Sequence, residues 1–131
     1  MTTTDGTTPA PAITETVDAH LAAYGEPDPA RRARLIASAW TPEGSLVDPP
    51  LDPATGHAGL DALFAAVQSH YPGHTFRRTT DVDGHHRAAR YGWEMLAPDG
   101  AVALAGTDVV ELAADGRLVQ VVGFFGELVP V

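Results

Sequence analysis

The sequence lacks several features that mark particular classes of protein. It contains no cysteine, which excludes disulfides and thiolate chemistry and is expected of a cytoplasmic protein. No apolar run approaches the roughly 20 residues of a membrane-spanning helix, and residues 1–11 lack the basic and apolar regions of a signal peptide. We therefore expect a disordered tail over residues 1–11 and one domain over residues 12–131, with no membrane association.

Basic residues are also scarce in this chain. It has 17 acidic and 8 basic residues, which gives a formal net charge of −9 at pH 7. This charge is unfavourable for binding to nucleic acid or to an anionic membrane surface. The sequence also has no P-loop, no glycine-rich dinucleotide motif and no zinc-type spacing of ligands. We therefore expect neither nucleic acid nor a membrane as a partner.

The periodicity of the apolar residues changes from helical to strand-like near the middle of the chain. Apolar residues at helical spacing predict three helices, over residues 13–24, 29–40 and 59–70, with a short extended piece over residues 45–48. Alternating patterns then predict four strands, over residues 75–82, 85–95, 101–112 and 117–125. Turn sequences at residues 83–84, 98–100 and 115–116 predict hairpins between them. Helices followed by antiparallel strands indicate an α+β fold, with the helices on one face of a curved sheet.

Asp108 is the unusual residue of the predicted strand over residues 102–112. One face of this strand carries Val102, Leu104, Gly106, Asp108, Val110 and Leu112. An ionised carboxylate among apolar side chains is costly unless it is paired, hydrogen-bonded or protonated. Asp108 is therefore a candidate functional residue, although a structural hydrogen bond or a strand kink beside Gly106 would also explain it.

Two polar residues in the helical half are further candidates. His20 lies on the apolar face of the first predicted helix, and Tyr24 lies one turn beyond it on the same face. Asp48 precedes Pro49-Pro50, which holds its backbone in an extended conformation. Both also have structural interpretations, because histidine on an apolar helix face is more often a core residue and Asp before Pro is common in turns.

The surroundings of Asp108 depend on how its strand pairs with the preceding one. A regular hairpin around Asp99-Gly100 places Tyr91 and Trp93 on the Asp108 face and Arg90 on the opposite face. A single β-bulge would reverse this and bring Arg90 to Asp108 as a salt-bridge partner that keeps the carboxylate ionised. We favour the regular pairing, with Trp93 as a wall of the pocket.

The outer face of the predicted sheet is apolar. The last strand, residues 118–125, has apolar residues on both faces, and the alternate face of residues 101–112 consists mainly of small uncharged residues. A sheet that is covered by helices on one side and is still apolar on the other usually meets a protein partner there. We therefore predict a homodimer formed through the sheet face.

In element order, residues 13–128 resemble the nuclear transport factor 2-like superfamily, and within it the ketosteroid isomerases and the SnoaL-like polyketide cyclases. Leu46-Val47-Asp48-Pro49 is similar to the segment in which the isomerases place a general-base Asp before a Pro. Asp108 falls where the isomerases have the protonated Asp of an oxyanion hole and where the cyclases have an acid/base residue. Gly123-Phe124-Phe125-Gly126-Glu127 resembles the isomerase segment whose Phe lines the ligand pocket.

This resemblance implies a cone-shaped α+β barrel in which three N-terminal helices and a mainly antiparallel sheet enclose an apolar cavity. Asp48, Asp108 and His20 would converge there as catalytic residues, and the substrate would contact Tyr24, Trp93 and Phe125. His20 stands where the isomerases have an oxyanion-binding Tyr, and a neutral imidazole can either donate a hydrogen bond or act as a base. The more deeply buried Asp108 would stay protonated as a donor, and Asp48 would stay ionised as the base.

Two functions fit this interpretation. The first is a cofactor-independent isomerase, cyclase or lyase that acts on a small hydrophobic carbonyl compound, and the second is a non-catalytic domain that binds a small molecule or dimerises. A metal ion could in principle use His70, His74, His85 and His86, but their spacing matches no established ligand pattern, so we expect none. Because neighbouring strand residues point to opposite faces, at most one of His85 and His86 faces the cavity.

Overall fold

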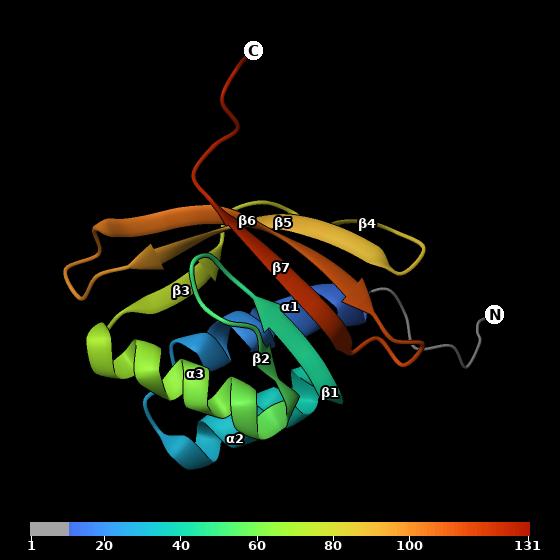
Figure 1. Ribbon diagram of the computed structural model, residues 1–131, viewed down its shortest axis with the longest axis horizontal. Coiled ribbons are helices and arrows are strands. Elements are labelled where there is room, and N and C mark those ends of the chain that lie inside the picture. Colours follow the sequence, from blue (N-terminus) through green and yellow to red (C-terminus); the bar gives the residue numbers. More distant parts are fainter. Residues whose placement is uncertain (1–10) are drawn as a thin grey trace.

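The computed structural model describes residues 11–131 as three helices packed against a curved, unclosed mixed sheet (Figure 1). The helices are α1 (Pro11–Tyr24), α2 (Pro29–Ala39) and α3 (Gly56–His70). Figure 1 shows all three on the same side of the sheet. The predicted α+β class and the three-helix arrangement are confirmed, whereas the predicted tail over residues 1–11 lies outside the described residues except for Pro11.

The sheet has seven strands within the described residues, in the order β2-β1-β7-β6-β5-β3, with β4 also paired to β5. Their bounds are β1 (Trp40–Val47), β2 (Ala54–Thr55), β3 (Thr75–Arg78), β4 (Asp83–His85), β5 (Ala88–Leu96), β6 (Val102–Leu112) and β7 (Leu118–Phe125). The pairing of β1 with β7 is parallel, and the other pairings are antiparallel. The chain therefore returns its last strand to the middle of the sheet, between β1 and β6.

Local sequence signals explain how the second helix begins. Asp28 has extended backbone angles, and its side chain accepts a hydrogen bond from the backbone N–H of Arg31 at 2.9 Å. This bond satisfies one of the free N–H groups of the first turn, and Pro29 has no N–H to satisfy. The helix then buries Ile36 and Ala39 against the core.

The end of that helix differs from the prediction. Trp40 has extended backbone angles, and it begins β1 instead of ending α2. The strand continues through Thr41–Gly44, which lie between the predicted helix over residues 29–40 and the predicted extended piece over residues 45–48. Its parallel pairing with β7 is irregular between Trp40 and Ser45, and the Trp40 ring lies where a side chain at residue 44 would stand. Because Gly44 has no side chain, the Trp40 ring has room beside it, and the strand forms here although its sequence lacks the alternation of apolar and polar residues.

The first predicted hairpin turn is also displaced. Asp83 and Gly84 belong to β4, and the turn falls at His86–Arg87, where His86 has a φ of 53°. Asp83 pairs across the strands with Arg90, and their side chains form an ion pair at 2.8 Å. The other two hairpins lie where predicted, and Gly100 and Gly116 have the positive φ angles that such turns require.

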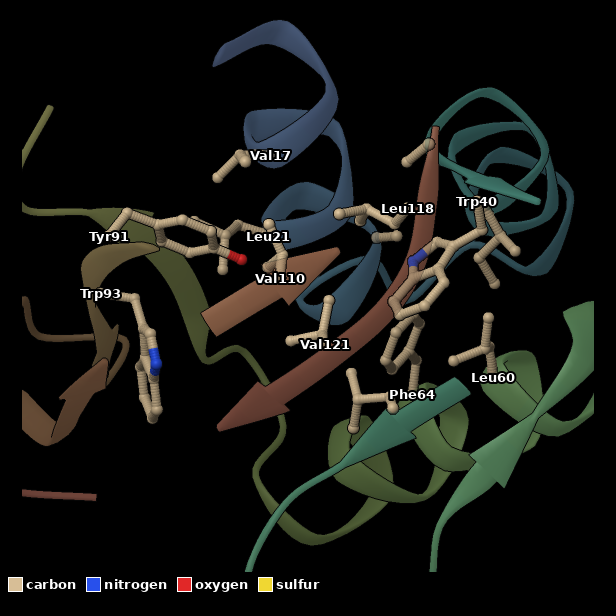
Figure 2. Close-up of a cluster of buried hydrophobic side chains, with 14 of the residues drawn as sticks. Val17, Leu21, Trp40, Leu60, Phe64, Tyr91, Trp93, Val110, Leu118 and Val121 are labelled. Carbon is tan, nitrogen blue, oxygen red and sulfur yellow. The ribbon is translucent and has the colours of Figure 1, made fainter. Parts of the chain in front are cut away.

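The hydrophobic core lies between the helices and the inner face of the sheet. Val17 and Leu21 of α1 and Phe64 of α3 are buried against strand residues that include Val110 and Val121 (Figure 2). The opposite face of the sheet exposes Val109 and Phe124, at 44% and 55% of their surface. The homodimer through this face stays a prediction. No helix within residues 11–131 is long and apolar enough to cross a membrane.

Candidate active site

A cavity of about 220 Å³ lies between α1, α3 and the inner face of the sheet. Most of its lining is aliphatic, aromatic or proline, from Leu21 and Leu46 to Phe76, Met95 and Leu104. Its polar lining side chains are Tyr24, Asp48, Tyr71, Trp93 and Asp108. The two predicted catalytic carboxyl groups therefore face the same cavity.

Asp108 lies in the middle of β6, on the face that points into the cavity. It is opposite Tyr91 on β5 and Gly123 on β7. The Tyr91 hydroxyl donates a hydrogen bond to Asp108 Oδ2 at 2.8 Å. Burial raises the pKa of Asp108 to about 7, and the bond from Tyr91 opposes part of this rise. The carboxyl is thus in the range where it can hold or release a proton near neutral pH.

Asp48 follows the last residue of β1, at the edge of the same cavity. The Tyr24 hydroxyl, from the last turn of α1, donates a hydrogen bond to Asp48 Oδ2 at 2.7 Å. Burial raises the pKa of Asp48, and the bond from Tyr24 lowers it in part. Each carboxyl group is therefore held by one tyrosine, and burial raises the pKa of both tyrosines.

Gly123 is the backbone position that brings the two carboxyl groups together. A side chain at residue 123 would overlap Asp48 Oδ1, and its Cβ would lie 3.1 Å from Asp108 Oδ1. Neither carboxylate forms an ion pair with any residue from 11 to 131. Two buried, unneutralised carboxyl groups over one glycine are therefore candidates for an acid/base pair and do not form a structural salt bridge.

The pairing of β5 with β6 decides the position of Arg90. The register is regular from Ala88 to Met95, so Tyr91 is opposite Asp108 and Trp93 is opposite Gly106. Arg90 points to the other face and pairs with Asp83. The predicted facing is confirmed, because Tyr91 and Trp93 share the face of Asp108 and Arg90 does not reach it. The predicted regular hairpin is wrong, because the pairing shifts by one residue between Met95 and Leu96.

His20 is not placed in the cavity. It is fully buried, and its Nδ1 accepts a hydrogen bond from the Trp40 indole N–H at 3.2 Å. Its ring packs beside Tyr24, Trp40 and Phe64, and burial lowers its pKa to about 3. The structure thus corrects the expectation that His20 converges with the two carboxyl groups. Tyr24, one helical turn later, is the residue of α1 that reaches a carboxyl group.

The three predicted substrate contacts all line the cavity. Tyr24 and Trp93 lie on its inner wall, and Phe125 lies at the end of β7 with 43% of its surface exposed. The four histidines considered for a metal ion do not gather. Within residues 11–131, no three His, Cys, Asp or Glu side chains are grouped as a metal ion would require.

Two residues of the site were not among those predicted from the sequence. Tyr91 was placed on the Asp108 face by the hairpin register, so its contact could have been predicted from the sequence. Gly123 carries no comparable signal, because its role depends on the parallel neighbour β1 and on the Asp48 side chain that follows it. Tyr91 and Gly123 thus complete the set of residues that position the two carboxyl groups.

The chain is similar to known proteins at the levels of family and structure. The model of the SnoaL-like domain matches residues 17–121, and no curated protein sequence matches the chain significantly. A solved structure of a candidate isomerase of the SnoaL-like family from Agrobacterium tumefaciens is 35% identical. Its match covers 89% of this chain and 99% of that one, with a TM-score of 0.81.

Two more distant structures share the fold alone. A candidate SnoaL-like polyketide cyclase from Jannaschia is 15% identical over 94% of this chain and 91% of that one, with a TM-score of 0.66. The epoxide hydrolase/cyclase-like enzyme SalBIII of salinomycin formation is 16% identical over 87% and 90%, with a TM-score of 0.64. The match to the family model and to the Agrobacterium structure shows that the chain belongs to the SnoaL-like family.

Proposed function

We propose that this protein is an acid/base enzyme that moves a proton next to a carbonyl group of a small hydrophobic substrate. The observation that carries the proposal is the pair Asp48 and Asp108, buried over Gly123 in one apolar cavity and each held by a tyrosine. Structural carboxylates are normally exposed or neutralised by a cation. Two that are buried without a cation are the arrangement that proton transfer requires.

The surroundings of the two groups support different roles. Burial raises the pKa of Asp108 to about 7, so Asp108 supplies the proton donor. Asp48 supplies the base, because the Tyr24 hydroxyl stabilises its ionised form. In the step, a C–H bond beside the carbonyl breaks and its proton goes to Asp48. The electron pair moves to the carbonyl oxygen, which is stabilised by the proton of Asp108.

The enolate formed in this way can be used in several ways. Return of the proton to another carbon gives an isomer, attack of the enolate on a second carbonyl closes a ring, and departure of a β-hydroxyl gives a lyase reaction. None of these needs a cofactor, since both the acid and the base are side chains of the protein. The SnoaL-like polyketide cyclase and SalBIII, with the same fold, are both described by a ring-forming activity, which agrees with the ring closure in this group of reactions.

The size of the cavity limits the substrate. A volume of about 220 Å³ exceeds the roughly 150 Å³ that is enough for benzene and is below the roughly 300 Å³ of the smaller drug-sized sites. It suits compounds of one or two rings, and it is small for a four-ring steroid. 2-Tetralone, a two-ring ketone with acidic protons beside its carbonyl, is therefore a suitable first substrate.

The test is the exchange of these protons for deuterium in D2O, followed by NMR. We expect the protein to accelerate exchange, and Asp48→Asn and Asp108→Asn each to reduce the acceleration by about 10²-fold or more, as for the loss of a general acid or base. Asp83→Asn is the matched control, because it makes the same change at an exposed carboxylate on the outer face. No acceleration by the wild-type protein, or equal rates in all four proteins, would instead favour a non-catalytic binding domain.

A further inference from the structure

Trp93 is a closely packed aromatic side chain of the cavity wall. It lies on β5, two residues after Tyr91, and it is 5% exposed. Its ring covers Gly106 on β6, where an added Cβ would lie 2.6 Å from Trp93 Cζ2. The rings of Phe76 and Phe125 stand beside it, with centroids at 6.1 and 5.9 Å. The indole therefore has little freedom to turn.

The indole N–H of Trp93 has no hydrogen-bond partner within the described residues. A buried donor without a partner is costly and uncommon in folded proteins. The other tryptophan shows the usual arrangement, because the Trp40 N–H donates to His20 Nδ1 at 3.2 Å. Trp93 lines the cavity, so its unpaired donor lies in the cavity wall, although the nitrogen itself has almost no surface open to solvent.

The free donor lies beside the proposed acid. The Trp93 N–H is close enough to the Asp108 carboxyl to lower the pKa of that group as a weak donor, although the contact lies outside the geometry of a full hydrogen bond. Figure 2 shows the Trp93 ring next to Tyr91, with its nitrogen turned to the side on which the Tyr91 hydroxyl lies. That hydroxyl holds Asp108 at 2.8 Å. The N–H of Trp93 and the carboxyl of Asp108 therefore serve the same part of the cavity.

We propose that the Trp93 N–H is a second donor to the oxygen of the substrate, beside the proton of Asp108. The subsite then takes a molecule of one or two rings that carries a carbonyl, enol or phenol oxygen, and it selects against a hydrocarbon of the same shape. This inference rests on the proposed function in one respect, namely that Asp108 supplies the other donor. A ligand oxygen at this place satisfies the buried N–H and receives two hydrogen bonds.

The two donors differ in a way that matters for the reaction. Asp108 releases its proton near neutral pH, whereas an indole N–H is a donor only and keeps its proton. Trp93 therefore continues to bind the oxygen when Asp108 is ionised. Its fixed ring also keeps the donor in place before the substrate arrives, as stabilisation of a developing negative charge requires.

The test compares two probes of nearly equal shape by calorimetry, 2-naphthol and 2-methylnaphthalene. The variant Trp93→Phe removes the N–H and keeps an aromatic ring. We expect it to weaken binding of 2-naphthol by about 3- to 10-fold, the value of one neutral hydrogen bond. Binding of 2-methylnaphthalene should change by less than about twofold, because it has no oxygen to accept the bond.

NMR of the wild-type protein gives a second measurement that does not depend on the folding of the variant. The chain has 2 tryptophans, so two indole N–H signals are expected. The Trp40 signal can be identified by its proximity to His20. We expect 2-naphthol to shift the Trp93 N–H signal downfield and leave the Trp40 signal in place, and 2-methylnaphthalene to produce no comparable shift.

Three results would overturn the inference. These are equal losses of affinity for both probes in Trp93→Phe, an unmoved Trp93 signal when 2-naphthol is bound, and failure of 2-naphthol to bind below millimolar concentration. Because these measurements need no turnover, they separate the inference from the proposed function. Selective binding without exchange of 2-tetralone would support the subsite and reject the enzyme, and exchange without selective binding would do the reverse.

Discussion

Replacement of Asp108 by Asn should make the protein more stable at alkaline pH while it removes the proposed acid. Burial raises the pKa of Asp108 from 3.8 to about 7. A shift of about three units at about 1.4 kcal/mol each corresponds to roughly 4 kcal/mol between pH 4 and pH 8. Asparagine has a similar shape, can still accept the Tyr91 hydroxyl and never carries the charge.

The direction of the effect follows from proton binding. Between about pH 4 and pH 7 the folded protein holds a proton on Asp108 that the unfolded chain has released, so folding takes up a proton. The stabilising contribution is complete below the unfolded pKa and is lost as the pH rises through the folded pKa. The free energy of unfolding of the wild-type protein should therefore fall across this range. Burial also raises the pKa of Asp48, so Asp48 acts in the same direction.

Urea denaturation of the wild type, Asp108→Asn and Asp83→Asn at pH 4.5, 6, 7 and 8 measures the effect. Asp83 is an exposed partner of Arg90, so its variant should follow the wild type. Asp108→Asn should lose less stability between pH 4.5 and pH 8, by roughly 3 kcal/mol. If the curves of wild type and Asp108→Asn run parallel, the carboxyl of Asp108 does not hold the buried proton and the assignment of the acid fails.

Two further predictions concern the base. In a pH profile of deuterium exchange, Tyr24→Phe should move the acidic limb to higher pH, because the Tyr24 hydroxyl lowers the pKa of Asp48, and it should leave the alkaline limb of Asp108 unchanged; an unmoved acidic limb would contradict the role of Asp48. Gly123→Ala should reduce exchange about tenfold to a hundredfold and lower the free energy of unfolding by about 1–3 kcal/mol, because its Cβ displaces the Asp48 carboxyl. Gly59→Ala, in α3, has room for its Cβ and is the control.

Much of the sheet and part of the site could be predicted from the sequence. The alternation of residues 102–112 placed Asp108 on an apolar face, because a strand has a period of two. The sequence also placed Tyr91 and Trp93 beside it, and they lie there, but through a one-residue shift in the pairing between Met95 and Leu96 that a regular hairpin does not contain. The displaced turn at His86 shows the limit, since Asp-Gly favours a turn but cross-strand pairing of Asp83 with Arg90 prevails.

The sequence by itself therefore determined the α+β class, the face of Asp108 and the apolar wall that includes Trp93. Only the tertiary structure decided that Tyr24, and not His20, reaches a carboxyl group, and that Asp48 meets Asp108 over Gly123. Helix periodicity gives a shared face to His20 and Tyr24, but the tertiary contacts of α1 separate them, because His20 meets Trp40 and Tyr24 meets Asp48. The meeting of the carboxyl groups depends on the parallel pairing of β1 with β7, which joins distant segments and leaves no local pattern in the chain.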